Sequence, residues 1–226
     1  MEIYIDSANA VVIRDLCRYY PVAGVTTNPT IIAREKGDFR KILTDVRLAA
    51  ENRLVHAQVT AETAEGMLAD ARDLYELLGD PFAVKVPVTK EGLRAIPLLK
   101  AEGFTVTATA IFSPVQAVLA AAAGADYAAP YINRFDTVCG GGVRLVSDIA
   151  CLYAENGYGT KILAASFKNA QQIAEVMTAG AASVTLAPDL FDAMLSHPMT
   201  DLAMDAFRRD WTGVYKDASV QTLLEK

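Results

Sequence analysis

Short runs of apolar and β-branched residues recur along the chain at intervals of about 20 to 35 residues. Each run is long enough for one strand, and each gap leaves room for one helix, which is the repeat length of strand–helix units. The pattern therefore predicts eight strands that alternate with helices, at residues 2–6, 22–26, 54–59, 82–87, 104–110, 126–131, 161–166 and 183–187.

The segments between these runs carry helical periodicity. In 61–79, the apolar residues Met67, Ala71, Leu74 and Leu78 fall on one helical face, and a Gly-Asp-Pro sequence ends the segment. This pattern predicts an amphipathic helix that packs on the sheet through that face.

Helix-end signals mark two further segments. In 113–124, Ser113 is a capping residue, Pro114 suits the first helical position, and Gln116 suits the return contact of a capping box. The segment 169–180 likewise begins with a capping asparagine and ends with glycine. Both segments are therefore predicted to be helices.

One helical segment contains a proline in its interior. Pro97 lies well inside 91–103, and a proline there removes a backbone hydrogen bond and crowds the preceding turn. We expect the helix to kink or restart at this residue. Because the segment belongs to the outer helix layer, Pro97 should leave a site at the strand ends undisturbed.

Eight strands that alternate with helices over 226 residues indicate a single-domain (β/α)8 TIM barrel spanning residues 1–226. The alternative is an open doubly wound sheet, which typically carries a glycine-rich first turn. The first turn here reads DSANA and contains no glycine. Residues 212–226 follow the last expected barrel helix, and we expect this tail, with its Val, Tyr and Leu side chains, to pack on a neighbouring subunit rather than on its own barrel.

Polar side chains lie at or just after the ends of seven consecutive strands. In a barrel these ends meet on one face, where catalytic side chains are found. The candidates are Asp6, Thr26, Asn28, Gln58, Lys85, Thr107, Thr109, Tyr131, Arg134 and Ser166.

Lys85 is the most informative candidate, because it lies in the apolar run FAVKVP. A lysine on an exposed strand edge would be the alternative, but both faces of a parallel barrel are covered. Burial disfavours the ammonium form, and the neutral amine is a nucleophile towards carbonyl carbon. The sequence therefore predicts a functional lysine inside the barrel.

The other candidates also have structural explanations. Asp6 and Ser166 could be helix caps, and Thr26 with Asn28 could form a cap and turn before a proline. Thr107 and Thr109 are common strand residues, Gln58 and Tyr131 could be ordinary packed side chains, and Arg134 could be a solvated surface residue. A packed core residue is the expected role of His56, and a flexible loop is expected for CGGGV at 139–143 rather than a phosphate loop.

Composition narrows the function classes. The net charge is −6 with no basic run, which argues against nucleic acid as a partner. No apolar stretch is long enough for a membrane span, and the acidic start does not resemble a signal peptide. Three cysteines and two histidines fit no metal or disulfide spacing. We expect a cytoplasmic protein with reduced thiols and no metal.

The motifs YIDSAN, GVTTNPTII, AQV, VKVPVT, APYINR and AASF resemble, in this order, the short transaldolase-like proteins that include fructose-6-phosphate aldolase. The resemblance extends over nearly the whole chain. It implies a (β/α)8 barrel, a Schiff-base mechanism without metal or other cofactor, and a homo-oligomer, specifically a decamer of two pentamers.

The resemblance also implies roles for individual residues. Lys85 matches the imine-forming lysine, and Asp6, Thr26, Asn28 and Thr109 match residues around the hydroxylated donor chain. Arg134 and Ser166 match contacts to the acceptor's phosphate. Gln58 and Tyr131 match the aldolase subgroup, whereas transaldolases tend to carry glutamate and phenylalanine there.

The expected function is reversible cleavage of fructose 6-phosphate or a similar ketose phosphate into dihydroxyacetone and glyceraldehyde 3-phosphate. Tyr131, through a water held by Gln58 and Thr109, is the expected proton carrier. Three alternatives stay open: a transaldolase, an aldolase for a related sulfonated ketose, and a sugar-phosphate-binding protein without activity.

Overall fold

The computed structural model describes residues 1–225. It divides them into two compact units, residues 1–191 and the segment from residue 192 onward. The second unit thus begins 20 residues before the tail expected from residue 212, and the long helix α11 (Pro198–Tyr215) runs across that expected boundary. The packing of the tail on another subunit stays a prediction.

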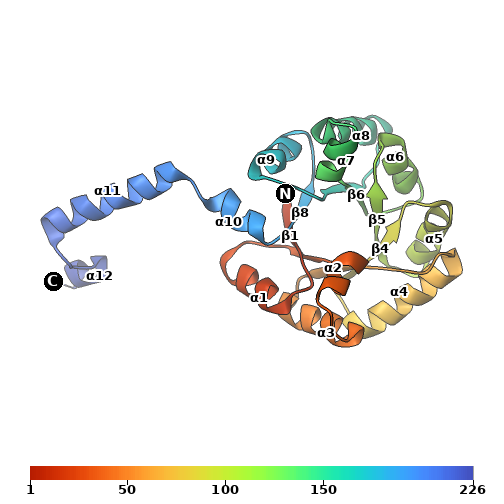
Figure 1. Ribbon diagram of the computed structural model, residues 1–226, viewed down its shortest axis with the longest axis horizontal. Helices are drawn as coiled ribbons and strands as arrows, with labels where there is room; N and C mark the ends of the chain where they lie inside the picture. Colours follow the sequence, from red (N-terminus) through yellow and green to blue (C-terminus); the bar gives the residue numbers. More distant parts are fainter. Residues whose placement is uncertain (226) are drawn as a thin grey trace. The chain divides into compact units, whose positions relative to one another are not determined.

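The first unit is a closed barrel of eight parallel strands in sequence order, as the alternating pattern predicts (Figure 1). Every neighbouring pair is parallel, including β1 with β8, which closes the barrel. The strands are β1 (Glu2–Asp6), β2 (Gly24–Thr26), β3 (Leu54–Gln58), β4 (Phe82–Pro87), β5 (Thr105–Ile111), β6 (Tyr127–Pro130), β7 (Lys161–Ala164) and β8 (Ser183–Leu186).

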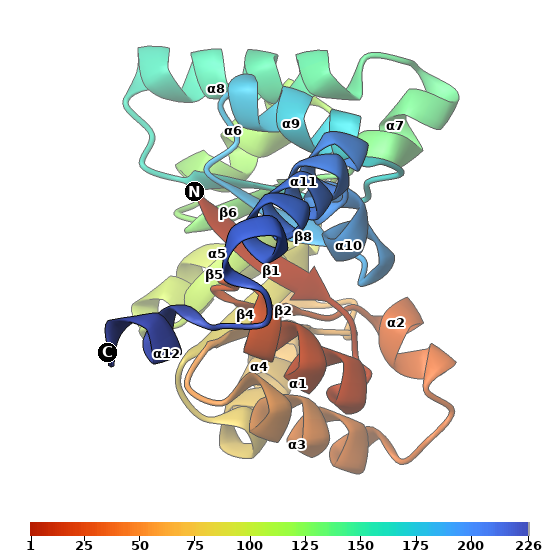
Figure 2. The same ribbon diagram turned by 90° about the vertical axis from the view of Figure 1, so that its left-hand side faces the viewer.

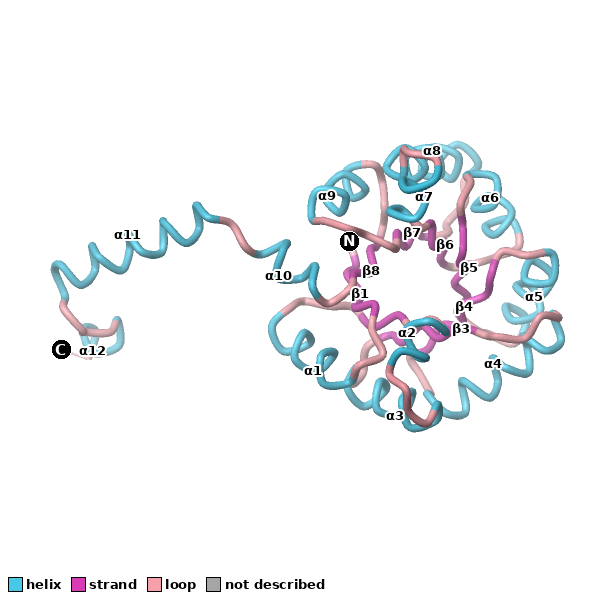
Figure 3. The backbone as a smooth tube through the Cα atoms, in the orientation of Figure 1, coloured by secondary structure: helices cyan, strands magenta, loops and turns pink. Residues whose placement is uncertain are grey.

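Helices surround the strands, and both the ribbon and the tube view show them outside the barrel (Figure 3). Two helices, rather than one, follow β2 and β6. The helices of this unit are α1 (Ala10–Tyr19), α2 (Pro29–Arg34), α3 (Phe39–Ala50), α4 (Ala64–Leu78), α5 (Lys90–Ala101), α6 (Pro114–Ala122), α7 (Ile132–Val138), α8 (Gly142–Asn156) and α9 (Ala170–Thr178), with α10 (Asp189–Leu195) beginning at its end.

The helix α4 confirms the periodicity argument. The four predicted apolar residues are buried, together with Ala64, while the opposite face is exposed. Removal of this face from water stabilises the fold by roughly 25 cal/mol per Å² of apolar area. The helix therefore lies against the sheet in the orientation that its sequence predicts.

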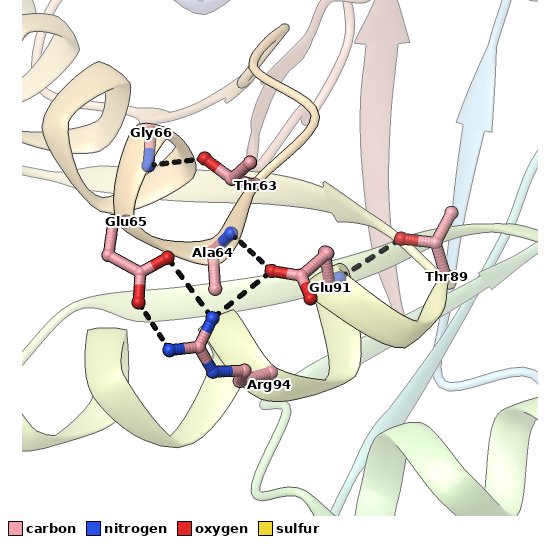
Figure 4. A network of polar contacts seen from close by, with 8 residues as sticks. Thr63, Ala64, Glu65, Gly66, Thr89, Glu91 and Arg94 are labelled. Carbon is pink, nitrogen blue, oxygen red and sulfur yellow. Dashed lines mark hydrogen bonds and ion pairs between the residues drawn. The ribbon is translucent and has the colours of Figure 1, made fainter.

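Helix caps join neighbouring helices in the outer layer (Figure 4). Thr63 and Thr89 cap α4 and α5 through their hydroxyl groups. Glu91, in the first turn of α5, accepts a hydrogen bond of 2.9 Å from the backbone N–H of Ala64 at the start of α4. Arg94 then bridges Glu91 and a glutamate of α4, so one network fixes the starts of two adjacent helices.

The two other capping predictions hold with one change. Ser113 accepts from the N–H of Gln116, as a capping box requires, but the Gln116 side chain accepts from the N–H of Phe112 instead of Ser113. Asn169 caps α9 by accepting from Gln172. The return contact thus reaches one residue farther back than the usual box, into the end of the strand connection.

Pro97 does not restart the helix in which it lies. The helix α5 runs unbroken from Lys90 to Ala101. Pro97 is on the exposed side of α5, away from the buried residues Ala95, Ile96 and Leu99. The ring therefore projects towards solvent, and α5 continues without a break although Pro97 lacks a backbone N–H.

The second unit contains the end of α10, followed by α11 and α12 (Val220–Leu224). Trp211 stacks near Tyr215 with ring centroids 4.8 Å apart, and its indole N–H donates to the carbonyl of Ala218. None of the residues of α11 is buried. Throughout residues 1–225, no helix is long and apolar enough to cross a membrane.

Candidate active site

The pocket that contains Lys85 lies at the carboxyl ends of the strands and has a volume of about 140 Å³. In Figure 2 the short helices α2 and α7, which follow β2 and β6, lie on this side of the barrel. Six of the ten predicted site residues line the pocket: Asp6, Asn28, Lys85, Tyr131, Arg134 and Ser166.

Lys85 is buried in the barrel interior, with only 4% of the residue exposed. Its Nζ donates a hydrogen bond of 2.8 Å to the backbone carbonyl of Thr27. Burial lowers the pKa of Lys85, while the negative charge of Asp6 opposes that shift. A larger share of the amine is therefore neutral near pH 7 than for a lysine in water, which suits a nucleophile.

The close packing of α5 fixes the strand that carries Lys85. A Cβ added to Gly92 would lie 1.9 Å from the carbonyl oxygen of Pro87, the last residue of β4. Only glycine allows α5 to approach the strand end this closely. The helix consequently holds β4 in place two residues beyond the lysine.

Asp6 is the carboxylate of the pocket. It accepts a hydrogen bond of 2.7 Å from the Thr26 hydroxyl, which also lies 2.6 Å from the Thr185 hydroxyl. Burial raises the pKa of Asp6, and the charge of Lys85 is the largest opposing influence. Thr26 thus reaches the site through Asp6 and does not itself line the pocket.

Asn28 both caps a helix and lines the pocket. Its side chain caps α2 by accepting from the N–H of Ile31 at 3.0 Å, and the same residue lines the pocket beside Lys85. The structural and functional explanations of the TTNP motif are therefore compatible. The motif places an amide in the pocket because that amide starts the helix.

Tyr131 and Thr109 form a hydroxyl pair at the edge of the pocket. Their oxygens are 3.2 Å apart, and the ring of Tyr131 packs edge-on against Phe112. Strand β5 changes register between Ala108 and Ile111, and the residue within this bulge, Ala110, has a φ of +59°. Such bulges redirect side chains near active sites, and this one lies directly beside Thr109.

Arg134 and Ser166 line the pocket from α7 and from the segment just after β7. The Arg134 guanidinium lies over the ring of Tyr131, 5.0 Å from its centroid. Ser166 adopts a φ of +65°, an uncommon conformation for a residue with a Cβ, and its carbonyl accepts from the N–H of Asn133 at 2.6 Å. Uncommon backbone conformations of this kind concentrate at binding sites.

Besides Thr26 and Thr109, two more predicted residues do not line the pocket. Thr107 pairs with Lys85 in the β4–β5 ladder but is fully buried, and its hydroxyl is 2.9 Å from Nδ1 of His56. Gln58 is the ladder partner of Lys85, but its side chain lines a neighbouring groove with Phe39 and Thr60. The structure thus brings Gln58 next to Lys85 through the backbone, although Gln58 does not line the pocket of Lys85.

His56 is a packed core residue, as predicted. It is fully buried, and Tyr4 and Tyr127 contact its ring edge-on at 4.9 and 5.3 Å. Burial, with a smaller contribution from the charge of Lys85, lowers the pKa of His56 to about 3. Within residues 1–225, its Nε2 has no hydrogen-bond partner.

The glycine-rich sequence at 139–143 forms the turn between α7 and α8. Gly140 and Gly141 have positive φ angles of +70° and +84°, which glycine adopts without strain. The N–H of Gly142 donates to a carboxylate oxygen of Asp136 at 2.6 Å. The first amide of α8 is therefore already occupied, which argues against a phosphate loop here, while the expected flexibility stays a prediction.

Sequence reasoning missed several pocket residues. Thr185 lies on the one strand for which no polar residue was proposed, and its alternation with Ser183 was an available signal. Arg34 lies at the end of a short helix for which the sequence gives no inward direction. The additional lining residues are Thr30, Ile31, Arg34, Ala129, Leu163, Ala165 and Thr185.

One comparison with known proteins bears on this site. A family model described as transaldolase/fructose-6-phosphate aldolase matches residues 3–226. The match covers both structural units and every residue of the pocket. It therefore agrees with the resemblance that the strand-end motifs indicate.

Proposed function

This chain belongs to the transaldolase/fructose-6-phosphate aldolase family, and we propose that it is an aldolase that reversibly cleaves fructose 6-phosphate or a similar ketose phosphate. It is an enzyme of the class I, Schiff-base type and is transaldolase-like. The observation that carries the proposal is the buried amine of Lys85 in a pocket with Asp6 and with Tyr131, whose hydroxyl lies 3.2 Å from that of Thr109.

The reaction begins with attack of the neutral Lys85 amine on C2 of the ketose. Loss of water gives an iminium ion, which accepts electrons from the C3–C4 bond as the C4 hydroxyl loses its proton. Glyceraldehyde 3-phosphate leaves, and the donor carbons remain as an enamine on Lys85. Protonation of the enamine at C3 and hydrolysis of the imine then release dihydroxyacetone.

Tyr131 is the proposed proton carrier. Its hydroxyl lines the pocket of Lys85 and lies 3.2 Å from that of Thr109, so the two can relay a proton between substrate and solvent. The proposed role of Gln58 is to orient a water molecule, since an amide donates and accepts hydrogen bonds but does not exchange a proton near neutral pH. Its place beside Lys85 in the β3–β4 ladder supports this role.

Asp6 and Asn28 are proposed to bind the hydroxyl groups of the donor chain. A carboxylate and an amide accept hydrogen bonds from hydroxyl groups, and both residues line the pocket together with Lys85. Thr26 holds Asp6 from the side, and Thr107 supports the layer below through His56. Arg134 and Ser166 are assigned to the phosphate of the acceptor.

The test compares cleavage with transfer. With fructose 6-phosphate alone we expect free dihydroxyacetone, since the tyrosine hydroxyl supports protonation of the enamine. With erythrose 4-phosphate added, the ratio of dihydroxyacetone to transfer product is measured. The paired changes Tyr131→Phe and Gln58→Glu should move this ratio towards transfer.

The matched control is Tyr158→Phe, which removes a phenol hydroxyl outside the pocket and should leave the ratio unchanged. Efficient transfer by the unmodified protein without release of dihydroxyacetone would show that it is a transaldolase instead. Binding of the sugar without a reducible adduct would indicate a protein that only binds sugar phosphates.

A further inference from the structure

Arg34 lines the same pocket as Lys85, although neither its position in the sequence nor a strand pattern marks it. It is the last residue of α2, the helix that Asn28 caps. Arg134 lines the pocket from α7. Helices α2 and α7 lie on the same side of the barrel at opposite flanks (Figure 2), so two arginines reach one pocket from two directions.

Both arginines act on the same carboxyl group. Burial raises the pKa of Asp6, and the positive charges of Lys85, Arg134 and Arg34 all oppose that rise. Charges in water are largely screened beyond about 10 Å. The two guanidinium groups are therefore within electrostatic reach of one point inside the pocket.

Neither arginine is neutralised by an ion pair. Among residues 1–225, no carboxylate oxygen lies within 4.0 Å of the Arg34 or Arg134 guanidinium. Arg94 in the outer layer, held between two glutamates, shows the opposite arrangement (Figure 4). Because Arg134 stacks on Tyr131 through its face, its in-plane N–H groups remain available to a ligand.

The pocket consequently has an excess of positive charge. Lys85, Arg34 and Arg134 face a single carboxylate, Asp6, in a protein whose net charge is −6. Formation of an iminium on Lys85 keeps one of these charges in place during the reaction. The excess corresponds to the charge of one doubly negative ligand group.

We propose that Arg34 and Arg134 together bind a doubly charged oxyanion on the acceptor end of the substrate, and that Arg34 makes the enzyme prefer a phosphate monoester to a sulfonate. The proposal rests on the proposed aldolase function, of which it specifies the substrate class. A phosphate monoester carries between 1.5 and 2 negative charges near pH 7 because its second pKa is about 6. A sulfonate carries a single charge, so one guanidinium balances it.

The experiment measures KM and kcat with fructose 6-phosphate, 6-deoxy-6-sulfofructose and fructose. For Arg34→Ala we expect KM for the phosphate to rise about ten-fold. This is the effect expected from the loss of one charge-assisted hydrogen bond at the weak end of the usual range, because the group is exposed. KM for the sulfonate should rise less, and KM for fructose should not change. Arg34→Lys should recover part of the loss, since it keeps the charge without the planar fork.

Arg40→Ala is the matched control. Arg40 lies in the first turn of the next helix, α3, and lines the adjacent groove instead of the Lys85 pocket, so its loss removes the same charge from the same region. It should leave the ratio of KM for phosphate and sulfonate unchanged. Equal increases in KM for all three substrates in Arg34→Ala would overturn the proposal, as would an unchanged KM for the phosphate.

A binding arm separates this proposal from the aldolase assignment. Glucitol 6-phosphate has no carbonyl group and forms no imine, so calorimetric titration with it reports on the anion site alone. Weaker binding to Arg34→Ala, with no cleavage by the unmodified protein, would support the anion site and reject the aldolase. Cleavage together with equal binding to both proteins would reject the anion site and keep the aldolase.

Discussion

At the amino-terminal end of the barrel, inward-facing polar groups are paired with one another, whereas at the carboxyl end they are left facing a pocket. At the first end, Glu2 accepts from Lys161 at 2.8 Å and from the Tyr4 hydroxyl at 3.0 Å, and the Tyr4 and Tyr127 hydroxyls are 3.4 Å apart. At the other end, Lys85 has one backbone acceptor. The same barrel geometry thus produces one end that satisfies its polar groups and one that exposes them to a ligand.

The pKa values of Glu2 and Lys85 also distinguish the two ends of the barrel. Burial raises the pKa of Glu2, but hydrogen bonds from Lys161 and Tyr4 outweigh burial and leave it below its ordinary value. For Lys85 burial wins, and its pKa falls. Charge is therefore stabilised at the amino-terminal end and destabilised at the carboxyl end, which is the condition that nucleophilic catalysis by an amine requires.

The largest expected effect comes from replacing one lysine at each end of the barrel, in separate variants, and comparing the two. Lys85→Met should lose all imine formation and cleavage, while Lys161→Met should keep both, since Lys161 serves only the pairing at the amino-terminal end. Borohydride reduction with dihydroxyacetone, followed by mass mapping of the labelled peptide, measures the imine. A label on any other lysine, or activity retained in Lys85→Met, would contradict the assignment.

The layer between the two ends should control stability in acid. The native pKa of His56 is about 3 against about 6.5 in an unfolded chain. Below pH 6.5 the unfolded chain therefore takes up a proton that the native state refuses. Stability from this residue is present above pH 6.5 and is lost as the pH falls towards 3, by up to about 1.4 kcal/mol per unit.

The double change His56→Phe and Thr107→Val removes both hydrogen-bonding partners of this layer while it keeps the ring between Tyr4 and Tyr127. Both proteins should lose unfolding free energy between pH 7 and pH 4.5. The loss should be smaller in the double variant, by about 2 to 3 kcal/mol. Urea unfolding at both values measures this. His197→Gln, at an exposed helix cap, is the control, and equal pH dependence in all three proteins would disprove the explanation.

The contrast between the two ends also explains what the sequence could predict. Alternation within strands and helix-end signals gave the barrel, because both are local consequences of backbone geometry. Lys85 was found because an amine in an apolar run is unusual. The contribution of Arg34 to the pocket, the Thr27 carbonyl that accepts from Lys85, and the place of Gln58 in a neighbouring groove depend on contacts between distant segments, which no local pattern encodes.

A smaller effect is expected from the paired carboxylate at the amino-terminal end. Glu2→Gln keeps acceptors for Tyr4 but removes the charge that pairs with Lys161. Both side chains are partly exposed, at 33% and 48%, so solvent screening limits the loss to about 0.5 to 1.5 kcal/mol of unfolding free energy. Because the native pKa of Glu2 is lowered, this contribution is present above pH 4.5 and disappears as the pH falls through the native value.

Denaturant unfolding at pH 7, with and without 1 M salt, measures this contribution, and salt should reduce the difference between Glu2→Gln and the unmodified protein. Cleavage per folded molecule should not change. A loss of cleavage in Glu2→Gln at full folding would mean that the two ends are coupled, and the separation between them would have to be abandoned.

The smallest expected effect concerns the backbone at the carboxyl end, at Ala110 in the β5 bulge. Its φ of +59° costs a residue with a Cβ about 1 to 2 kcal/mol relative to glycine. Ala110→Gly removes this cost but makes the unfolded chain more flexible, which returns about 0.4 to 1 kcal/mol. The net result should be a gain in stability of about 0.5 kcal/mol, whereas Ala110→Val, with a branched Cβ, should lose stability.

If the bulge serves to direct Thr109 towards Tyr131, Ala110→Gly should also lower kcat modestly with little change in KM, because the hydroxyl pair would be held less firmly. Ala101→Gly, at an exposed helix end with ordinary φ, is the control for flexibility alone and should lose stability without affecting kcat. A destabilised Ala110→Gly would show that the bulge carries no strain, and the carboxyl end would then differ from the amino-terminal end in its charges only.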